Sequence, residues 1–334
     1  MANNNFKPFA AAANANVMTQ ADYEALAALV TGFVSGTAQS AQLNKVWRQS
    51  SIIAAVLAQF IVDLTGQDAV DDGTTATLLA NLKIAVQAQS AAVIGHARNL
   101  VMSVPLASTA ATLTADEVVV GTALGGQKYL LKQFSKSINL TATGAGGMDT
   151  GSAPLSGYVA LYAIYNPTTG TTGLLARNAT SAIAPNVYGG ANMPAGFTAS
   201  ALVSVWPTNS SGQLKSGYQN DRRVSFTYTN ILTTNVTQPS LTSLSVASVI
   251  PANALSVSGS CAMSSTSAST LQMDLAGDAN TTGQNRTGFT TAGGSQGGVA
   301  SFNIPIIYPQ TIYYAATSTA GTPNFSSSIS SYVF

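Results

Sequence analysis

The chain has 334 residues, which is enough for two or three domains, each with a core of its own. Only 7% of these residues are charged, against about a quarter in an average soluble domain, and the net charge is +1. A surface made mainly of hydroxyls and amides does not attract nucleic acid or anionic membranes, so we exclude both as partners.

The single cysteine and the first residues limit the remaining classes. Cys261 cannot form an internal disulfide, and no CxxC pair exists to hold zinc. The opening run MANNNFKPFAAAANANVM has one lysine and no continuous apolar stretch, unlike a secretory signal. The longest apolar runs are far shorter than the ~20 residues of a membrane-spanning helix. We therefore expect neither export by the general secretory route nor insertion into a membrane.

Residues 1–18 are rich in Asn and Ala, with Phe6, Pro8 and Phe9 as the only bulky anchors. This composition predicts an extended arm that is disordered alone and could lie against a neighbour. Thr19, three residues before an acidic residue, predicts the N-cap of a short helix that ends near Gly32.

Residues 40–65 carry a heptad pattern, and Gly66 supplies a stop signal. The seam residues recur in alternating steps of three and four: Leu43, Val46, Ser50, Ile53, Leu57, Phe60 and Leu64. Their flanks are almost uncharged, so the salt bridges that usually select coiled-coil partners are missing. The pattern predicts a buried helix that packs against copies of itself.

A third helix is predicted from about residue 74 to residue 99, after a turn at residues 71–73. Its seam repeats the same spacing at Leu79, Leu82, Val86, Gln89 and Val93. Two such helices joined by a short polar loop predict a hairpin that buries its seams in an oligomeric bundle. An ordinary monomeric helical domain is the alternative.

From about residue 100 the helical periodicity stops and short strands alternate with turns rich in Gly, Asn and Pro. Residues 158–165 are apolar on both faces, which predicts a strand that is covered on both sides. The expected fold is α+β and multidomain. An N-terminal helical bundle or coiled-coil module (1–100) precedes two β-sandwich-like domains (101–235 and 236–334).

Residue types that carry catalysis are scarce. His96 is the only histidine, and we interpret it as a group that caps the last turn of the third helix rather than as a base. Asp71 and Asp72 fit a turn, while Asp274 and Asp278 have no neighbour that would raise a pKa. The run DLAGDANTTG lacks the ligand spacing of a calcium loop, and GAGG lacks that of a phosphate loop. We predict no enzyme activity, no metal and no cofactor.

Aromatic residues near predicted loops and strand ends are the stronger binding signal. Tyrosine and tryptophan faces among neutral hydrogen-bonding residues suit sugar rings, although such residues often fill cores instead. The receptor-binding candidates, with one arginine in the same region, are Tyr188, Trp206, Tyr218, Arg286, Tyr308, Tyr313 and Tyr314.

Several long motifs resemble the N-terminal module of tail-fibre proteins from tailed bacteriophages and prophages. They are FKPFA, TQADYEALAALVTGF, AQLNKVWRQSS, VLAQFIVDLTG and DDGTTATLLANL. The segments TADEVVVGTALGGQKYLL and APLSGYVALYAIYNPTTGTTGLLA are similar to β-domains found behind that module. The resemblance covers about the first two hundred residues.

The resemblance implies a homotrimeric virion fibre, assembled in the host cytoplasm, whose N-terminus docks on tail or baseplate proteins. Its distal β-domains would bind a bacterial surface polysaccharide or lipopolysaccharide. Attachment and trimer packing would fall on Phe6, Pro8, Phe9, Trp47 and on the seam residues Leu43, Val46, Ile53, Leu57, Phe60 and Leu64. No fibrous shaft is present, which implies a short fibre.

Two other functions fit parts of the pattern. A structural tail or baseplate adaptor would use the same β-domains to dock another fibre or spike instead of a receptor. A depolymerase tailspike would need a pair of catalytic carboxylates and a larger repetitive β-body, and the sequence indicates neither.

Overall fold

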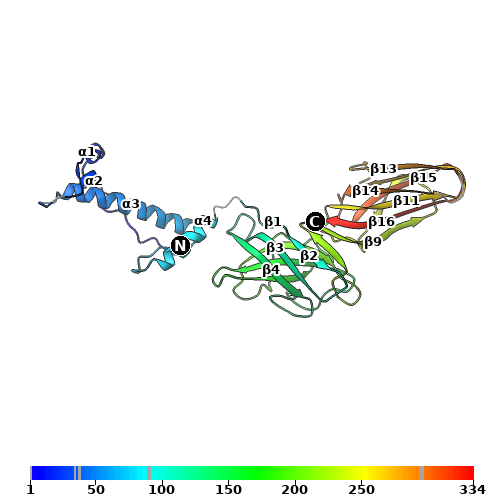
Figure 1. The fold of residues 1–334 in the computed structure, drawn as a ribbon, viewed down its shortest axis with the longest axis horizontal. Coiled ribbons are helices and arrows are strands. Elements are labelled where there is room, and N and C mark those ends of the chain that lie inside the picture. The colour runs from blue at the N-terminus through cyan, green and yellow to red at the C-terminus, as the bar shows by residue number, and fades with distance from the viewer. Residues whose placement is uncertain (1, 34, 37–38, 89–91, 293–296) are drawn as a thin grey trace. The chain divides into compact units, whose positions relative to one another are not determined.

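The structure is a computed structural model that describes residues 2–33, 35–36, 39–88, 92–292 and 297–334. The chain divides into two compact units, Met1–Ala91 and Ala92–Phe334. In the described ranges, the helices belong to the first unit and the strands to the second (Figure 1). The expected division of the β-part at residue 235 falls inside the second unit.

The prediction of an α+β protein with an N-terminal helical bundle or coiled coil is wrong, because the protein is mostly β and the described helices form neither. The helices are α1 (Gln20–Glu24), α2 (Ala28–Thr31), α3 (Ser40–Thr65) and α4 (Ala76–Ala88). Local signals at two ends are confirmed. Thr19 accepts a hydrogen bond from the Asp22 amide at the start of α1, and Gly66 ends α3 in the left-handed conformation.

The third helix is also shorter than predicted. α4 ends at Ala88, while the expected seam position Gln89 lies outside the described residues. The amide of Gly95 donates to Val119, and β1 (Ala97–Arg98) pairs with the second unit's sheet. Sheet pairing thus overrides the helical periodicity here. His96 is an exposed residue before a strand and does not cap a helix.

The second unit is built on a large antiparallel sheet, whose described strands run in the order β14-β11-β16-β9-β8-β2-β3-β7-β5-β6, with β1 and β4 also paired to β3 (Figure 1). The remaining strands of this sheet are β2 (Val101–Val104), β3 (Ala110–Gly121), β4 (Lys128–Asn139), β5 (Tyr158–Asn166), β6 (Thr171–Asn178), β7 (Ala199–Pro207), β8 (Gly217–Asn220), β9 (Arg223–Thr234), β11 (Ser256–Ser265), β14 (Gly297–Pro305) and β16 (Pro323–Val333). The prediction that β5 is covered on both sides is confirmed, since its first seven residues are all buried.

A smaller antiparallel sheet faces the distal strands of the large one. Its order is β10-β15-β12-β13, with bounds Gln238–Ser245, Thr311–Ser318, Ser269–Ala276 and Asn285–Thr291 respectively. Buried and half-buried residues alternate along β11, and its inward side chains share a core with those of β12. This alternation is what a strand with one covered face requires.

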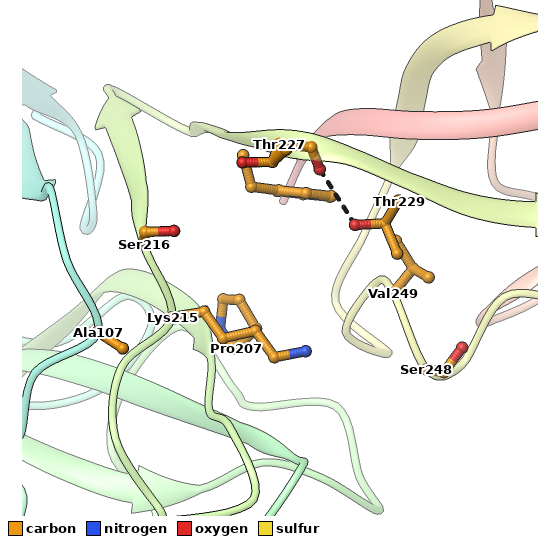
Figure 2. Close-up of a pocket in the computed structure, with 9 residues that line it drawn as sticks. Ala107, Pro207, Lys215, Ser216, Thr227, Thr229, Ser248 and Val249 are labelled. Carbon is orange, nitrogen blue, oxygen red and sulfur yellow. Dashed lines mark hydrogen bonds between the residues drawn. The ribbon is translucent and has the colours of Figure 1, made fainter.

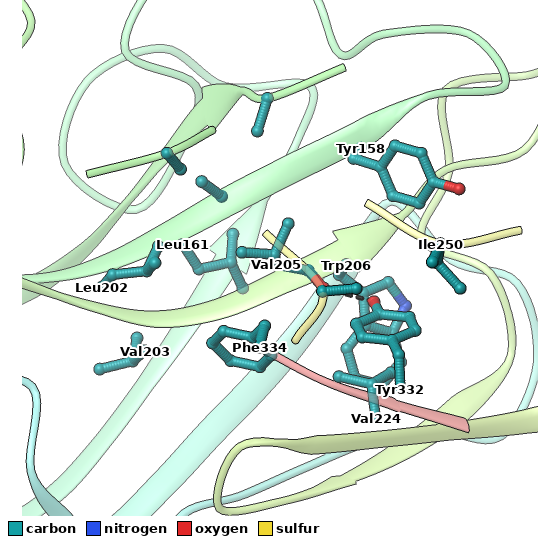
Figure 3. Packing of buried hydrophobic residues seen from close by; sticks show 14 of the residues in the cluster. Tyr158, Leu161, Leu202, Val203, Val205, Trp206, Val224, Ile250, Tyr332 and Phe334 are labelled. Carbon is teal, nitrogen blue, oxygen red and sulfur yellow. Dashed lines mark hydrogen bonds between the residues drawn. The ribbon is translucent and has the colours of Figure 1, made fainter. Parts of the chain in front are cut away.

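One hydrophobic core runs through the whole second unit, across the expected division at residue 235. Trp206 of β7 and Tyr332 of β16 are fully buried beside each other in it (Figure 3). The Tyr332 hydroxyl donates to the carbonyl of Val205, and the Trp206 indole donates to the carbonyl of Lys215. The last strand of the chain is therefore locked onto the first half of the unit.

Gly259 lies where β11 and β16 approach each other closely. A Cβ at this position would lie 2.0 Å from the carbonyl oxygen of Ser328, whereas one at Gly288 would find its nearest neighbour at 3.8 Å. We expect Gly259→Ala to lower the free energy of unfolding by roughly 1–3 kcal/mol through overpacking. Gly288→Ala, a matched change in β13, should stay within about 0.5 kcal/mol of wild type. Urea denaturation followed by circular dichroism measures both, and equal values would contradict this packing.

Candidate functional site

The N-terminal arm lies on its own helix α3. The amide of Asn3 donates to Asp68 at 2.6 Å, the side chain of Asn4 donates to the carbonyl of Ala55 at 3.3 Å, and the amide of Phe9 donates to the hydroxyl of Ser51 at 2.8 Å. The expectation of an arm without structure of its own is therefore not met. The arm's side-chain and backbone amides tie it along one side of α3.

Phe6 places its ring in an apolar groove between α3 and α4. The groove has a volume of about 300 Å³ and is lined by Phe6, Ala54, Leu57, Ala58, Ile61, Thr75, Leu78, Leu79 and Leu82. Among the described residues of this unit, the buried apolar side chains are Ala58, Ile61, Ala69 and Ala85, and the first three form one cluster. A core this small leaves most of the apolar surface of both helices uncovered.

The predicted seam of α3 does not form the packing face within the chain. The seam positions Ile53 and Leu57 are 61% and 47% exposed, whereas the buried positions are Ala58 and Ile61. Trp47, which lies beside the seam, is 53% exposed. The face of α3 that packs within the chain is shifted by one residue from the predicted seam. The reason is that α4 and the N-terminal arm cover the small residues of α3. Phe9 stands with its ring edge to Trp47 at a centroid distance of 5.6 Å and stays exposed.

Two of the predicted receptor-binding residues are buried, so they cannot contact a receptor directly. Trp206 is fully enclosed in the core. Tyr188 is 7% exposed, stacks edge-on against Tyr162, and donates its hydroxyl to Asp149 at 2.8 Å. Both are aromatic residues with one polar atom, and this atom donates a hydrogen bond to an acceptor inside the protein.

The other predicted aromatic residues do not converge on one site. Tyr218 of β8 is 46% exposed. Tyr308 and Tyr313 form a pair near the start of β15, with ring centroids 6.4 Å apart, and Tyr308 is exposed. Tyr314 packs partly buried against the core. Tyr308 and Tyr313 are close in space because they are close in the sequence, with one turn between them.

Arg286 is held by a buried carboxylate. Its Nε and Nη2 atoms donate to the two oxygens of Asp274 at 3.0 and 3.1 Å, and Gln272 donates to the same carboxylate at 3.0 Å. This bond to Asp274 raises the pKa of Arg286. Because two of its nitrogens are bonded to one carboxylate, we interpret Arg286 as a structural cation, although its side chain is 61% exposed.

A second concave site, which the sequence reasoning missed, lies at the junction of β7, β8 and β9 (Figure 2). It encloses about 220 Å³ and is lined by Ala107, Pro207, Lys215, Ser216, Phe226, Thr227, Thr229, Ser248 and Val249. We call it the bulge pocket, because β9 departs from regular pairing there. Its residues come from four separate parts of the sequence, so no local motif marks it.

The part of the chain that the structure describes holds no group of side chains of the kind that binds a metal ion. No three His, Cys, Asp or Glu side chains converge there. Asp71 and Asp72 accept amide hydrogen bonds of their own turn, and Asp278 does the same in its loop. Within the same residues, every helix is too short or too polar to cross a bilayer.

Comparisons with known proteins identify no family. No family model matches the chain, and no curated protein matches it. A crystal structure of a Bacillus thuringiensis Cry1Da tryptic core variant is similar at 9% identity, with a TM-score of 0.18. The match covers 73% of this chain and 54% of that one, so the chain spans about half the length of that protein. A likeness at this score supports no statement about fold or function.

Tyr188 gives a prediction at alkaline pH. Burial and the hydrogen bond to Asp149 raise its pKa from 10.0 to about 12. The folded state keeps a proton that the unfolded chain releases, so this contribution to stability is complete below pH 10 and is lost between pH 10 and 12. We expect Tyr188→Phe to reduce, without abolishing, the fall in melting temperature over that range.

The control for this experiment is Tyr218→Phe, which changes an exposed ring. It should keep the wild-type fall in melting temperature between pH 10 and 12. The loss that persists in Tyr188→Phe belongs to the other tyrosines whose pKa burial raises, which are Tyr129, Tyr158, Tyr162 and Tyr332. An unchanged slope in Tyr188→Phe would contradict the assignment.

Proposed function

We propose that this protein is a tail-fibre protein of a tailed bacteriophage or prophage. Its N-terminal unit attaches it, as a homotrimer, to tail or baseplate proteins, and its β unit recognises a bacterial surface polysaccharide or lipopolysaccharide. The observation that supports this most is the set of large apolar side chains that the unit Met1–Ala91 leaves exposed.

These exposed residues occupy both long helices of the unit. Those on the two long helices are Trp47, Ile52, Ile53, Val56 and Leu57 on α3 and Leu79 and Val86 on α4, and the others of the unit are Phe9, Leu29, Val30, Phe33 and Val70. Isolated exposed apolar residues are normal on a soluble protein, but a contiguous strip of them marks a protein interface. Copies of the chain and a virion protein are the occupants that the resemblance to tail fibres favours.

The β unit has a different surface chemistry. Its exposed aromatic residues Tyr218, Tyr228 and Tyr308 stand among Ser, Thr and Asn side chains, and it is poor in charge. Tyrosine faces with neutral hydrogen-bonding groups around them suit sugar rings.

A structural adaptor that docks another fibre or spike is the second candidate. The observation that favours it is the outer strand β14, which pairs on one side only with β11 and exposes Val299 by 76%. An open strand edge can accept a strand from another protein. The adaptor and the receptor-binding fibre differ in whether polysaccharide binds.

The interface proposal is tested by the mass of the protein in solution. We expect wild type to sediment as a trimer and Leu57→Asp to sediment as a single chain, because a carboxylate in the strip would have to be buried. Leu124→Asp is the matched control, since Leu124 is 69% exposed in a turn of the β unit. Analytical ultracentrifugation measures all three. A monomeric wild type, or a trimeric Leu57→Asp, would overturn the role of this strip.

The receptor proposal is tested by binding of the full chain to immobilised bacterial lipopolysaccharides and capsular polysaccharides. A tail fibre should be retained by at least one of them and released by the same polysaccharide in solution. Retention by none of a broad panel would count for the adaptor.

A further inference from the structure

We propose that the bulge pocket is a subsite for a negatively charged sugar unit, with Lys215 as the group that reads its carboxylate or phosphate. This inference rests on the proposed function, because it assigns a place and a ligand class to the receptor binding. None of the residues that line the bulge pocket is one of the receptor-binding candidates predicted from the sequence.

A break in the register of β9 creates the pocket. Thr229 pairs with Ile329 and Ser225 pairs with Ser331, so residues 226–228 of β9 oppose Ser330 alone. Such a bulge releases side chains from strict alternation. Phe226 and Thr227 are consecutive, yet both line the pocket. Bulges are over-represented beside binding sites for this reason.

The walls of the pocket are held rigidly. The amide of Lys215 donates to the carbonyl of Pro207 at 3.0 Å, and its own carbonyl accepts from the indole of Trp206 at 2.9 Å. On the opposite wall, the hydroxyl of Tyr158 donates to the carbonyl of Ala247 at 2.9 Å. The backbones that present Lys215 and Ser248 are therefore both fixed to buried aromatic residues, which is the preorganisation that binding favours.

Lys215 brings an uncompensated positive charge to the pocket. It is the only charged residue among the described residues that line it. Its ammonium group makes no ion pair or hydrogen bond with any residue that the structure describes. Figure 2 places the amine and the hydroxyls of Ser216 and Ser248 on different sides of the same space. An anionic group in this space would meet the cation with no carboxylate in the lining to oppose it.

The remaining lining suits a sugar ring. The hydroxyls of Ser216, Thr227 and Ser248 have no partner among the described residues, and each can both donate and accept. Phe226 offers a ring whose orientation is fixed by Tyr332, at a centroid distance of 5.9 Å. Hydroxyls for directed hydrogen bonds and an aromatic face for stacking are the two elements of saccharide recognition.

The size of the pocket limits the ligand to one unit. Its volume of about 220 Å³ lies below the ~300–1,000 Å³ of sites for drug-sized ligands. A single sugar, as a chain end or a branch, fits this space better than an extended oligosaccharide. Acidic sugars and phosphorylated sugars share the chemistry that Lys215 would recognise.

The experiment uses the full chain and three soluble probes: D-glucuronate, glucose 6-phosphate and glucose. Ligand-observed NMR titration gives a Kd for each, first for wild type and then for Lys215→Met. We expect one or both anionic probes to bind wild type more tightly than glucose does. In Lys215→Met their Kd should rise roughly ten-fold, as for loss of one charge-assisted hydrogen bond, while that of glucose stays unchanged.

Lys132→Met is the matched control, because Lys132 is an exposed lysine of β4 and the change removes the same charge from the same unit. It should bind all three probes like wild type. Ser248→Ala, which removes one lining hydroxyl from a surface turn, should weaken every probe that the pocket binds. Melting temperatures confirm that the variants are folded. The anionic probe that binds identifies carboxylate or phosphate as the group recognised.

Where a probe binds, three outcomes would overturn the inference. They are equal affinity for glucose and both anionic probes, equal affinity of wild type and Lys215→Met, and an effect of Lys132→Met as large as that of Lys215→Met. If no probe binds while wild type is still retained by a polysaccharide, the pocket assignment fails and the receptor function stands. If no polysaccharide retains the protein either, the receptor function itself fails.

Discussion

The β unit depends on the insertion of its last strand into the middle of the large sheet. β16 lies between β11 and β9, and its Tyr332 reaches across to hydrogen-bond Val205 in the first half of the unit. Two residues further, the ring of Phe334 lies under the guanidinium of Arg222 at 5.1 Å. These contacts join segments more than 100 residues apart. The sheet can therefore close only after β16 has been made, and such long-range pairing is slow to form.

The bulge pocket follows from the same insertion. β9 pairs with β8 over its first residues and with β16 over most of its length, and the irregular register lies where the first pairing ends. Gly217 permits the close approach of β8, since a Cβ there would lie 2.8 Å from the carbonyl of Ser225 and 3.2 Å from the Trp206 ring. Phe226, one of the residues that line the pocket, also packs its ring against Tyr332, so the pocket and the core share one aromatic contact.

Local signals in the sequence predicted local structure well. The cap at Thr19, the stop at Gly66 and the doubly covered strand β5 depend on neighbouring residues, and all three are confirmed. The packing face of α3 was not predictable, because the heptad pattern was compatible with neighbouring faces and the arm that covers Ala58 comes from the other end of the unit. Tyr188 was misplaced for a related reason. Its acceptor, Asp149, lies 39 residues away and joins it only in the fold.

The scarcity of charge gives individual ions unusual weight in this protein. The chain has 13 Lys and Arg residues and 12 Asp and Glu residues in 334, so few charges can screen or compete with one another. Arg286 forms an ion pair with Asp274, and Arg222 donates a hydrogen bond to the carbonyl of Gly95 at 2.9 Å. Lys215 differs because its backbone is fixed, while its ammonium group, in a concave space, has no partner among the residues that the structure describes. On a surface of neutral hydroxyls, one such cation is sufficient to make a binding site select for charge.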